Sequence, residues 1–175
     1  MTRSPRVERR EPAMNAMRIG PVSCTVSAPP PLVYQMLSAV GQGPQRDGER
    51  SEVLQRDGDE LVCDFWTRVA LPGGLVRMVR TRELVRLRPP DAVEYEHLDG
   101  PLKGLRETIS LTGVAGGRTR MTYSGTYEPR DRLDAARTYL LARPIIHRTM
   151  RQHFEDLRER AEARAARSRV FPRDG

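Results

Sequence analysis

Four side chains that can exchange protons or donate hydrogen bonds fall in three neighbouring strand-like stretches: Tyr95, His97, Glu107 and Tyr123. Within each stretch they share the alternating positions of the apolar residues, a pattern typical of the buried face of a strand. A carboxylate among apolar neighbours is costly unless it is paired or neutralised. Glu107 and His97 are therefore the candidate catalytic pair, because acid–base catalysis of an aldol closure or a dehydration uses such groups.

A purely structural interpretation of Glu107 is also compatible with the sequence. The carboxylate could pair with His97 or with a buried arginine and perform no chemistry. A single β-bulge could instead turn it to the outside of the sheet.

The candidate ligand-binding residues are apolar or aromatic side chains that the same periodicities place inward: Phe65, Tyr95, Met121, Tyr123, Ile146, Met150 and His153. His153 lies between Met150 and Leu157 on the apolar side of a helical stretch. A lone histidine there is also compatible with a hydrogen-bonded core group. The remaining histidine, His147, is expected to face solvent.

Other common kinds of site have no counterpart in the sequence. No cluster of His, Cys and acidic residues has the spacing of a metal site, and no Ser or Cys lies in a nucleophile motif. The glycine-rich stretch 113–117 lacks the lysine and the helix that follow a phosphate-binding loop. Neither a metal nor another cofactor is expected.

The elements that must position these residues follow a simple order. Residues 22–26 alternate like a half-buried strand and lead into a helix over 29–37, with Ser27 as its cap and prolines in its first turn. Turn signals such as Asp57-Gly58 then separate the strand candidates, which should pair antiparallel in sequence order. These candidates are residues 51–56, 60–70, 75–88, 92–98, 102–112 and 118–127.

The chain closes with a long amphipathic helical stretch over about 133–167. Its apolar face is expected to include Leu133, Ala136 and Leu140. Pro144 should break it into a short helix before and a main helix over about 145–161, with a frayed end. A curved antiparallel sheet buries one face, and a long helix can cover that face. We therefore expect an α+β fold in which six to seven strands wrap around the C-terminal helix.

Alternation along the strands places a second group of residues outside. It sets Arg80, Arg82, Arg86 and Arg88 opposite Val79 and Val85, and it turns Trp66 outward beside Asp64. A one-residue change of register would instead turn Arg80 or Arg82 into the interior.

Several short motifs together resemble one known family. The segment V-S-A-P-P-P-L-V-Y-Q-M-L at 26–37 is similar to the junction between the first strand and first helix of START-like, or SRPBCC, proteins. The stretch G-P-L-K-G at 100–104 before Glu107, the stretch T-R-M-T-Y at 119–123, and the long last helix resemble later parts of that family. The resemblance covers about 18–165, which is the expected domain. Residues 1–17 are expected to be a disordered basic tail, and residues 166–175 a frayed one.

The resemblance implies a helix-grip fold with an apolar cavity between the sheet and the last helix. The family includes polyketide aromatase/cyclases and coenzyme Q-binding lipid carriers. The implied function is binding of a small hydrophobic or aromatic molecule in that cavity, with an activity like that of a polyketide cyclase/dehydrase. The alternative is a lipid or quinone carrier, without catalysis, that docks on membranes through its arginine-rich terminal helix.

The charge balance narrows the possible partners. The chain has 30 basic and 23 acidic residues, a net charge of +7 at pH 7, but the excess lies in the two ends. A nucleic-acid groove would carry its basic and aromatic residues on the folded body, so no nucleic acid is expected. Two cysteines, Cys24 and Cys63, and no apolar signal segment favour a cytoplasmic protein with reduced thiols.

Overall fold

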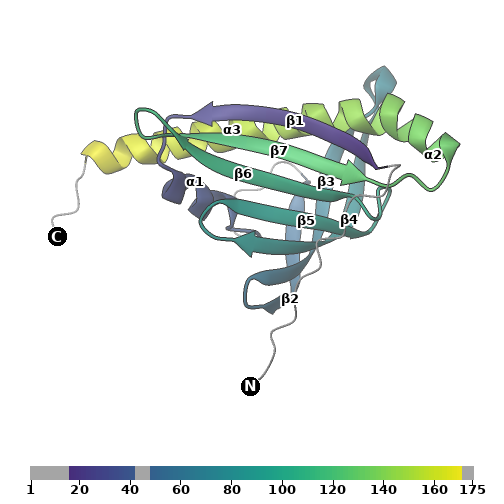
Figure 1. Ribbon diagram of the computed structural model, residues 1–175, viewed down its shortest axis with the longest axis horizontal. Coiled ribbons are helices and arrows are strands. Elements are labelled where there is room, and N and C mark those ends of the chain that lie inside the picture. The colour runs from purple at the N-terminus through teal and green to yellow at the C-terminus, as the bar shows by residue number, and fades with distance from the viewer. Residues whose placement is uncertain (1–15, 42–47, 171–175) are drawn as a thin grey trace.

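A seven-stranded antiparallel sheet forms the body of the protein in the computed structural model, which describes residues 16–41 and 48–170 (Figure 1). The strands are β1 (Met17–Val26), β2 (Arg50–Asp57), β3 (Glu60–Ala70), β4 (Val76–Arg88), β5 (Ala92–Asp99), β6 (Arg106–Val114) and β7 (Arg118–Tyr127). A short 3₁₀ turn, η1 (Pro72–Gly74), joins β3 to β4.

The order across the sheet is β1-β7-β6-β5-β4-β3-β2. Strands β2 to β7 therefore pair in sequence order, as the turn signals predict. Strand β1 lies beside β7, with Met17 opposite Tyr127, which the sequence alone did not indicate. It begins at Met17, inside the segment expected to be a tail, and residues 1–15 of that segment lie outside the described residues.

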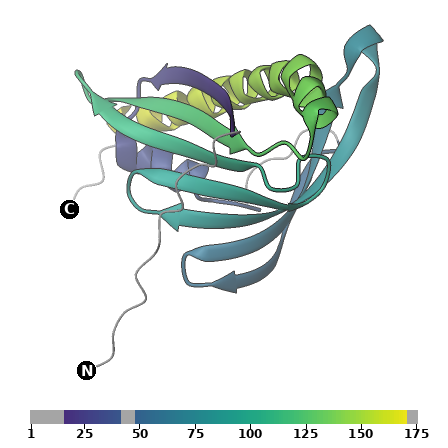
Figure 2. The ribbon, with the colours of Figure 1, turned by 45° about the vertical axis from the view of Figure 1, so that its right-hand side comes forward.

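Four helical segments complete the fold: α1 (Pro30–Leu37), α2 (Arg132–Arg137), a π-helical turn η2 (Thr138–Ala142) and α3 (Arg143–Val170). The sheet curves around α3, and α1 packs near the C-terminal half of that helix (Figures 1 and 2). This is the expected helix-grip arrangement. No helix in the described ranges is both long and apolar enough to cross a membrane.

The break before the main helix has a local cause. Pro144 has no N–H with which to continue an α-helical hydrogen-bond ladder. The widened turn η2 absorbs this defect, because the Arg143 N–H bonds to the Thr138 carbonyl one residue further back than in an α-helix. The predicted division at Pro144 is confirmed. The expected frayed tail is wrong over residues 166–170, because α3 stays helical to Val170, and residues 171–175 lie outside the described ranges.

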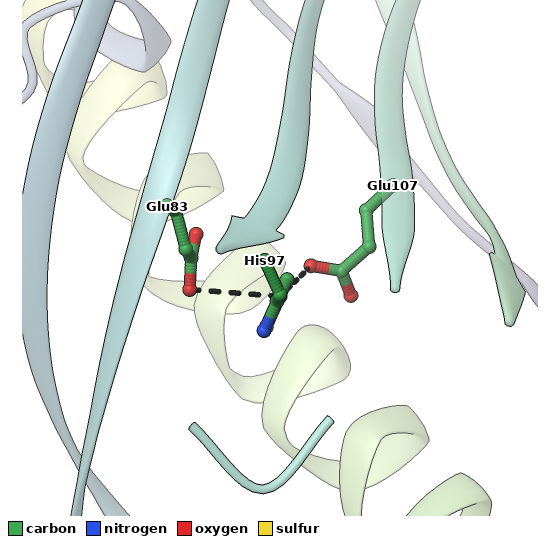
Figure 3. A group of neighbouring side chains, drawn as sticks. All are labelled: Glu83, His97 and Glu107. Carbon is green, nitrogen blue, oxygen red and sulfur yellow. Dashed lines mark hydrogen bonds and ion pairs between the residues drawn. The ribbon is translucent and has the colours of Figure 1, made fainter. Parts of the chain in front are cut away.

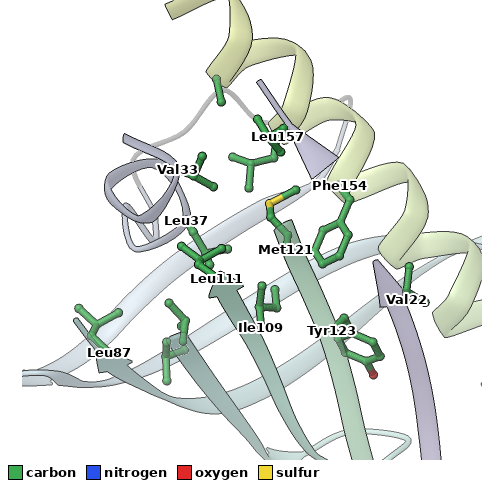
Figure 4. Close-up of a cluster of buried hydrophobic side chains, with 14 of the residues drawn as sticks. Val22, Val33, Leu37, Leu87, Ile109, Leu111, Met121, Tyr123, Phe154 and Leu157 are labelled. Atoms are coloured by element: carbon green, nitrogen blue, oxygen red, sulfur yellow. The ribbon is translucent and has the colours of Figure 1, made fainter. Parts of the chain in front are cut away.

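The core lies between the inner face of the sheet and one stripe of α3 (Figure 4). Phe154 and Leu157 of α3 are each 1% exposed, and they meet Met121 and Tyr123 of β7 in the same cluster. Val33 of α1 closes one end of it. The inward faces predicted for β6 and β7 are those that the structure buries.

Three other expectations about these elements are wrong. The strand predicted over 102–112 begins only at Arg106, because residues 101–104 form a turn between two glycines with positive φ. Leu133, Ala136 and Leu140 are exposed, because this segment packs through Thr138 and Asp134 and not through its apolar side chains. Ser27 does not cap α1, and its N–H instead donates to Glu162 of α3.

Candidate functional site

A compact polar cluster occupies the inner face of β4, β5, β6 and β7 (Figure 3). His97 Nε2 lies 2.8 Å from Glu107 Oε2 and 3.5 Å from Glu83 Oε1. The Tyr123 hydroxyl donates to Glu107 Oε1 at 2.5 Å, and the Thr81 hydroxyl donates to Glu83 Oε1 at 2.6 Å. One imidazole is thus held between two carboxylates, and a hydroxyl steadies each carboxylate.

The strand register explains why these residues meet. Glu83 lies directly opposite His97 in the β4–β5 pair, and Glu107 lies opposite Tyr95 in the β5–β6 pair. A register shift between Arg82 and Glu83 bends the ladder at this point, as β-bulges commonly do beside functional sites. His97 is therefore diagonal to Glu107 across the strand pair, within reach of a long side chain.

The cluster is largely removed from solvent. The side chains of Glu83, His97 and Glu107 are 11%, 9% and 14% exposed. Burial raises the pKa of Glu83, and the nearby Glu107 charge adds to that effect against the opposing influence of His97 and Thr81. Burial lowers the pKa of His97, but the Glu107 hydrogen bond and the charges of Glu83 and Glu107 outweigh it, so the net shift is upward.

Two tyrosines border the cluster on either side. Burial raises the pKa of Tyr123, and the hydrogen bond and charge of Glu107 raise it further. Burial and the charges of Glu83 and Glu107 likewise raise the pKa of Tyr95. Both hydroxyls therefore stay protonated at neutral pH, and that of Tyr123 donates its proton to the Glu107 hydrogen bond.

The three donor atoms of Glu83, His97 and Glu107 all lie within 4.8 Å of one another, close enough to share a metal ion. Each carboxylate nevertheless already accepts a hydrogen bond from a hydroxyl and faces the imidazole. A metal-bound histidine also usually donates its second ring nitrogen to an acceptor, whereas His97 Nδ1 has no partner among the described residues. The donor set fits an acid–base cluster better than a metal centre.

The structure separates the predicted site residues into three groups. His97, Glu107 and Tyr123 are brought together, with Tyr95 beside them, as the alternation predicted. Phe65, Ile146 and Met150 are partly buried at the margin of the core, whereas Met121 is fully buried within it.

His153 is the exception, because its side chain is exposed. The buried stripe of α3 continues from Met150 to Phe154 and then Leu157, and His153 lies one residue off that stripe. His153 therefore does not join the inner face. His147, expected to face solvent, is partly buried, and its Nε2 accepts the Gly20 N–H at 3.0 Å.

Glu83 and Thr81 were not predicted as site residues. The signal was nevertheless present, because Glu83 occupies the same alternating positions of β4 as Val85 and Leu87. An acidic residue in the apolar phase of a strand marks a buried carboxylate that needs a partner. Thr81 falls in the same phase and supplies the hydroxyl.

The arginines of β4 lie on the opposite, outer face, as the alternation predicts. Arg80 and Arg82 both donate to Asp64 of β3, at distances of 2.7 to 3.1 Å. These hydrogen bonds, with that from Arg82 foremost, lower the pKa of Asp64 to about 2. Arg50 stacks on the neighbouring Trp66 ring at 3.8 Å. Neither Arg80 nor Arg82 reaches the inner cluster.

An open groove of about 830 Å³ runs along η2 and the first half of α3, lined in part by Tyr139, Arg143 and His147. A smaller groove of about 210 Å³ lies between β1 and α3. None of the residues of the polar cluster lines either groove. The larger groove is lined by η2 and α3 alone, whereas the cluster lies on the inner face of the sheet.

Comparison with known sequences identifies the family. Residues 21–162 match the pattern of the family described as polyketide cyclase / dehydrase and lipid transport. The chain belongs to this family. The match covers most of the domain predicted from the START-like, or SRPBCC, motifs, and it includes every residue of the polar cluster. No curated protein sequence matches the chain significantly.

Solved structures share the family fold. The protein TTHA0849 from Thermus thermophilus is similar with a TM-score of 0.65 and 20% identity, over 86% of this chain and 99% of that one. The Zhui aromatase/cyclase from Streptomyces sp. R1128 has a TM-score of 0.60 and 17% identity, over 91% and 99%. A START superfamily protein from Mycobacterium smegmatis has a TM-score of 0.56 and 14% identity, over 86% and 99%.

Proposed function

We propose that this family member binds a small hydrophobic or aromatic molecule on the inner face of its sheet and acts on it as a polyketide cyclase/dehydrase-like protein. The observation that carries the proposal is the buried convergence of Glu83, His97, Glu107 and Tyr123 on the face that α3 covers. Phe65, Tyr95, Ile146 and Met150 would contact the apolar part of the ligand, because they border the core without being sealed within it.

The cluster has the chemical groups that an aldol-type dehydration requires. In that reaction one group removes a proton from the carbon next to a carbonyl. A second group gives a proton to the carbonyl oxygen and later takes it back. The hydroxyl leaves as water with the proton that the first group removed, and a carbon–carbon double bond forms. A carboxylate and an imidazolium can perform these two roles when they lie a few ångströms apart and out of bulk water. Glu107 and His97 have that relation.

A thermal-shift measurement with aromatic ketones, flavonoids and fatty acids tests the binding step. A ligand present at about 100 times its Kd stabilises the folded state by about 2.7 kcal/mol, which raises Tm by roughly 5–10 °C in a domain of this size. Met150→Trp should abolish the shift because the larger indole would block the partly buried margin of the core where the ligand is proposed to bind. Leu54→Ser, on the exposed part of β2, is the matched control and should leave the shift intact. No shift with any compound would refute the proposal.

A second candidate function, lipid or quinone carriage, is favoured by one surface feature. Large apolar side chains are exposed on α2 and η2 and at the start of β4, and both segments lie at one end of the molecule (Figures 1 and 2). They are Leu133, Tyr139, Leu140 and Leu141 on the first segment, and Leu75, Val76 and Met78 on the second. Arg77, Arg132 and Arg137 lie among them in sequence. Apolar and basic side chains together fit an anionic lipid surface.

Co-sedimentation with phosphatidylcholine vesicles, with and without phosphatidylglycerol, tests this candidate. Binding should require the anionic lipid, and Leu133→Ser/Leu140→Ser should weaken it several-fold, while Leu54→Ser should not. Loss of binding in Arg164→Glu/Arg167→Glu, with the leucine variant unaffected, would place docking on the terminal helix instead. Removal of that helix is a poorer test, because Ala161 and Ala165 are part of the core. No vesicle binding at low salt would exclude both forms of docking.

A further inference from the structure

The inference concerns the second nitrogen of His97. Carboxylate oxygens only accept hydrogen bonds, so the Nε2 that faces Glu107 and Glu83 must carry a proton. This contact fixes the tautomer of the neutral ring and leaves Nδ1 as the atom able to gain or lose a proton. Nδ1 is buried and has no hydrogen-bond partner among the residues that the structure describes. A buried polar atom in that state indicates a missing partner.

The groups around the ring decide which partner fits. Glu83 on β4 and Glu107 on β6 both place negative charge beside it, and the hydroxyl of Tyr123 on β7 is held by Glu107. Tyr95, on the same strand as His97, is neutral because its pKa is raised. None of the ion pairs observed among the described residues brings an arginine or lysine to either glutamate. The surroundings therefore favour the doubly protonated ring, in which Nδ1–H is a donor without an acceptor.

We propose that His97 Nδ1 is the atom of the site that recognises the ligand, and that it takes the oxygen of a neutral ketone on an otherwise hydrophobic molecule. A ketone oxygen accepts the Nδ1–H bond and brings no charge of its own. A ligand carboxylate would be repelled by Glu83 and Glu107, and a plain hydrocarbon would leave Nδ1 unpaired. The inference rests on the proposed binding function and narrows it to carbonyl compounds.

Three matched probes of nearly equal size test the assignment: 2-acetylnaphthalene, 2-ethylnaphthalene and 2-naphthoate. The ketone should bind at least about tenfold more tightly than the hydrocarbon, because a hydrogen bond to a charged donor contributes about 1.5–3 kcal/mol. It should also bind more tightly than the carboxylate. In His97→Gln the preference for the ketone over the hydrocarbon should shrink to about twofold or less, while Glu96→Gln on the outer face should keep it.

Nitrogen NMR of the protein with ¹⁵N-labelled histidine supplies a readout that needs no variant of the site. The chain has three histidines, and His147→Gln and His153→Gln identify two of the signals, which leaves that of His97. The ketone should shift the Nδ1 signal of His97 more than the Nε2 signal. Equal binding of all three probes with an unmoved Nδ1 signal would overturn this inference and leave hydrophobic binding standing. No binding of any probe would count against the proposed function itself.

Discussion

Replacement of Glu107 with glutamine should slow dehydration of a β-hydroxy ketone by about 10²–10⁴-fold, the range that positioned acid–base groups contribute. Glutamine keeps the size of the side chain and can still accept the Tyr123 hydrogen bond, but it removes the charge closest to His97. The pKa of His97 should then fall, because the Glu107 hydrogen bond and charge help to raise it. The turnover rate as a function of pH measures both effects, and the alkaline limb of the profile, where the imidazolium loses its proton, should move to lower pH.

Glu96→Gln is the matched control for this variant. Glu96 lies on the outer face of the adjacent strand β5 and pairs with Arg86 at 3.1 Å. It has the same chemistry as Glu107 but no contact with the inner cluster, so its loss should leave the rate within about twofold. Full turnover in Glu107→Gln would show that the cluster is structural, and the alternative of a paired carboxylate without chemistry would then hold.

Replacement of Phe154 with alanine should lower the free energy of unfolding by about 3–5 kcal/mol, the usual cost of emptying a buried aromatic site. Phe154 is 1% exposed and is packed between α3 and the inner face of β7 (Figure 4). Domains of this kind are stable by about 5–15 kcal/mol in total, so the loss is a large part of the whole. Equilibrium denaturation in urea measures it as a lower midpoint with little change in slope.

Leu140→Ala is the control from the same helical region. Leu140 lies on η2 and is 66% exposed, so its truncation should cost less than about 0.5 kcal/mol. Similar losses in the two variants would contradict the assignment of the buried stripe to α3 alone. They would mean instead that Leu140 also packs against the protein in solution.

Local pattern predicted much of the fold. The sequence predicted both ends of β3 (Glu60–Ala70) and β7 (Arg118–Tyr127). Each strand begins soon after a turn signal, which is Asp57-Gly58 for β3 and the glycine-rich stretch 113–117 for β7. The start of β6 was missed because the strand was placed directly after the turn signal Asp99-Gly100-Pro101, whereas Gly100 and Gly104 both adopt positive φ and the turn continues to Gly104. The place of β1 beside β7 depends on long-range pairing, which no local pattern encodes.

The site was predicted in part for a similar reason. Alternation alone turned His97, Glu107 and Tyr123 inward, and the structure joins them. Glu83 was missed although it lies in the apolar phase of β4. Only its pairing with His97 on the neighbouring strand, which sequence spacing does not reveal, shows what it contacts. His153 was misplaced because helical periodicity leaves an uncertainty of one residue, and the core takes Phe154 instead.

The position of β1 has a consequence for how the protein is made. The first strand is completed by segments from the far end of the chain: Gly20 bonds to His147 across 127 residues, and Ser27 bonds to Glu162 across 135. During synthesis, β1 and α1 therefore leave the ribosome long before β7 and α3 exist to receive them. Local contacts can form early, but the core must close late. Bringing distant segments of the chain together costs loop-closure entropy before any contact between them forms. Nascent chains that end before α3 should accordingly be easily digested by protease, and protection should appear only once Leu157 and Ala161 have emerged.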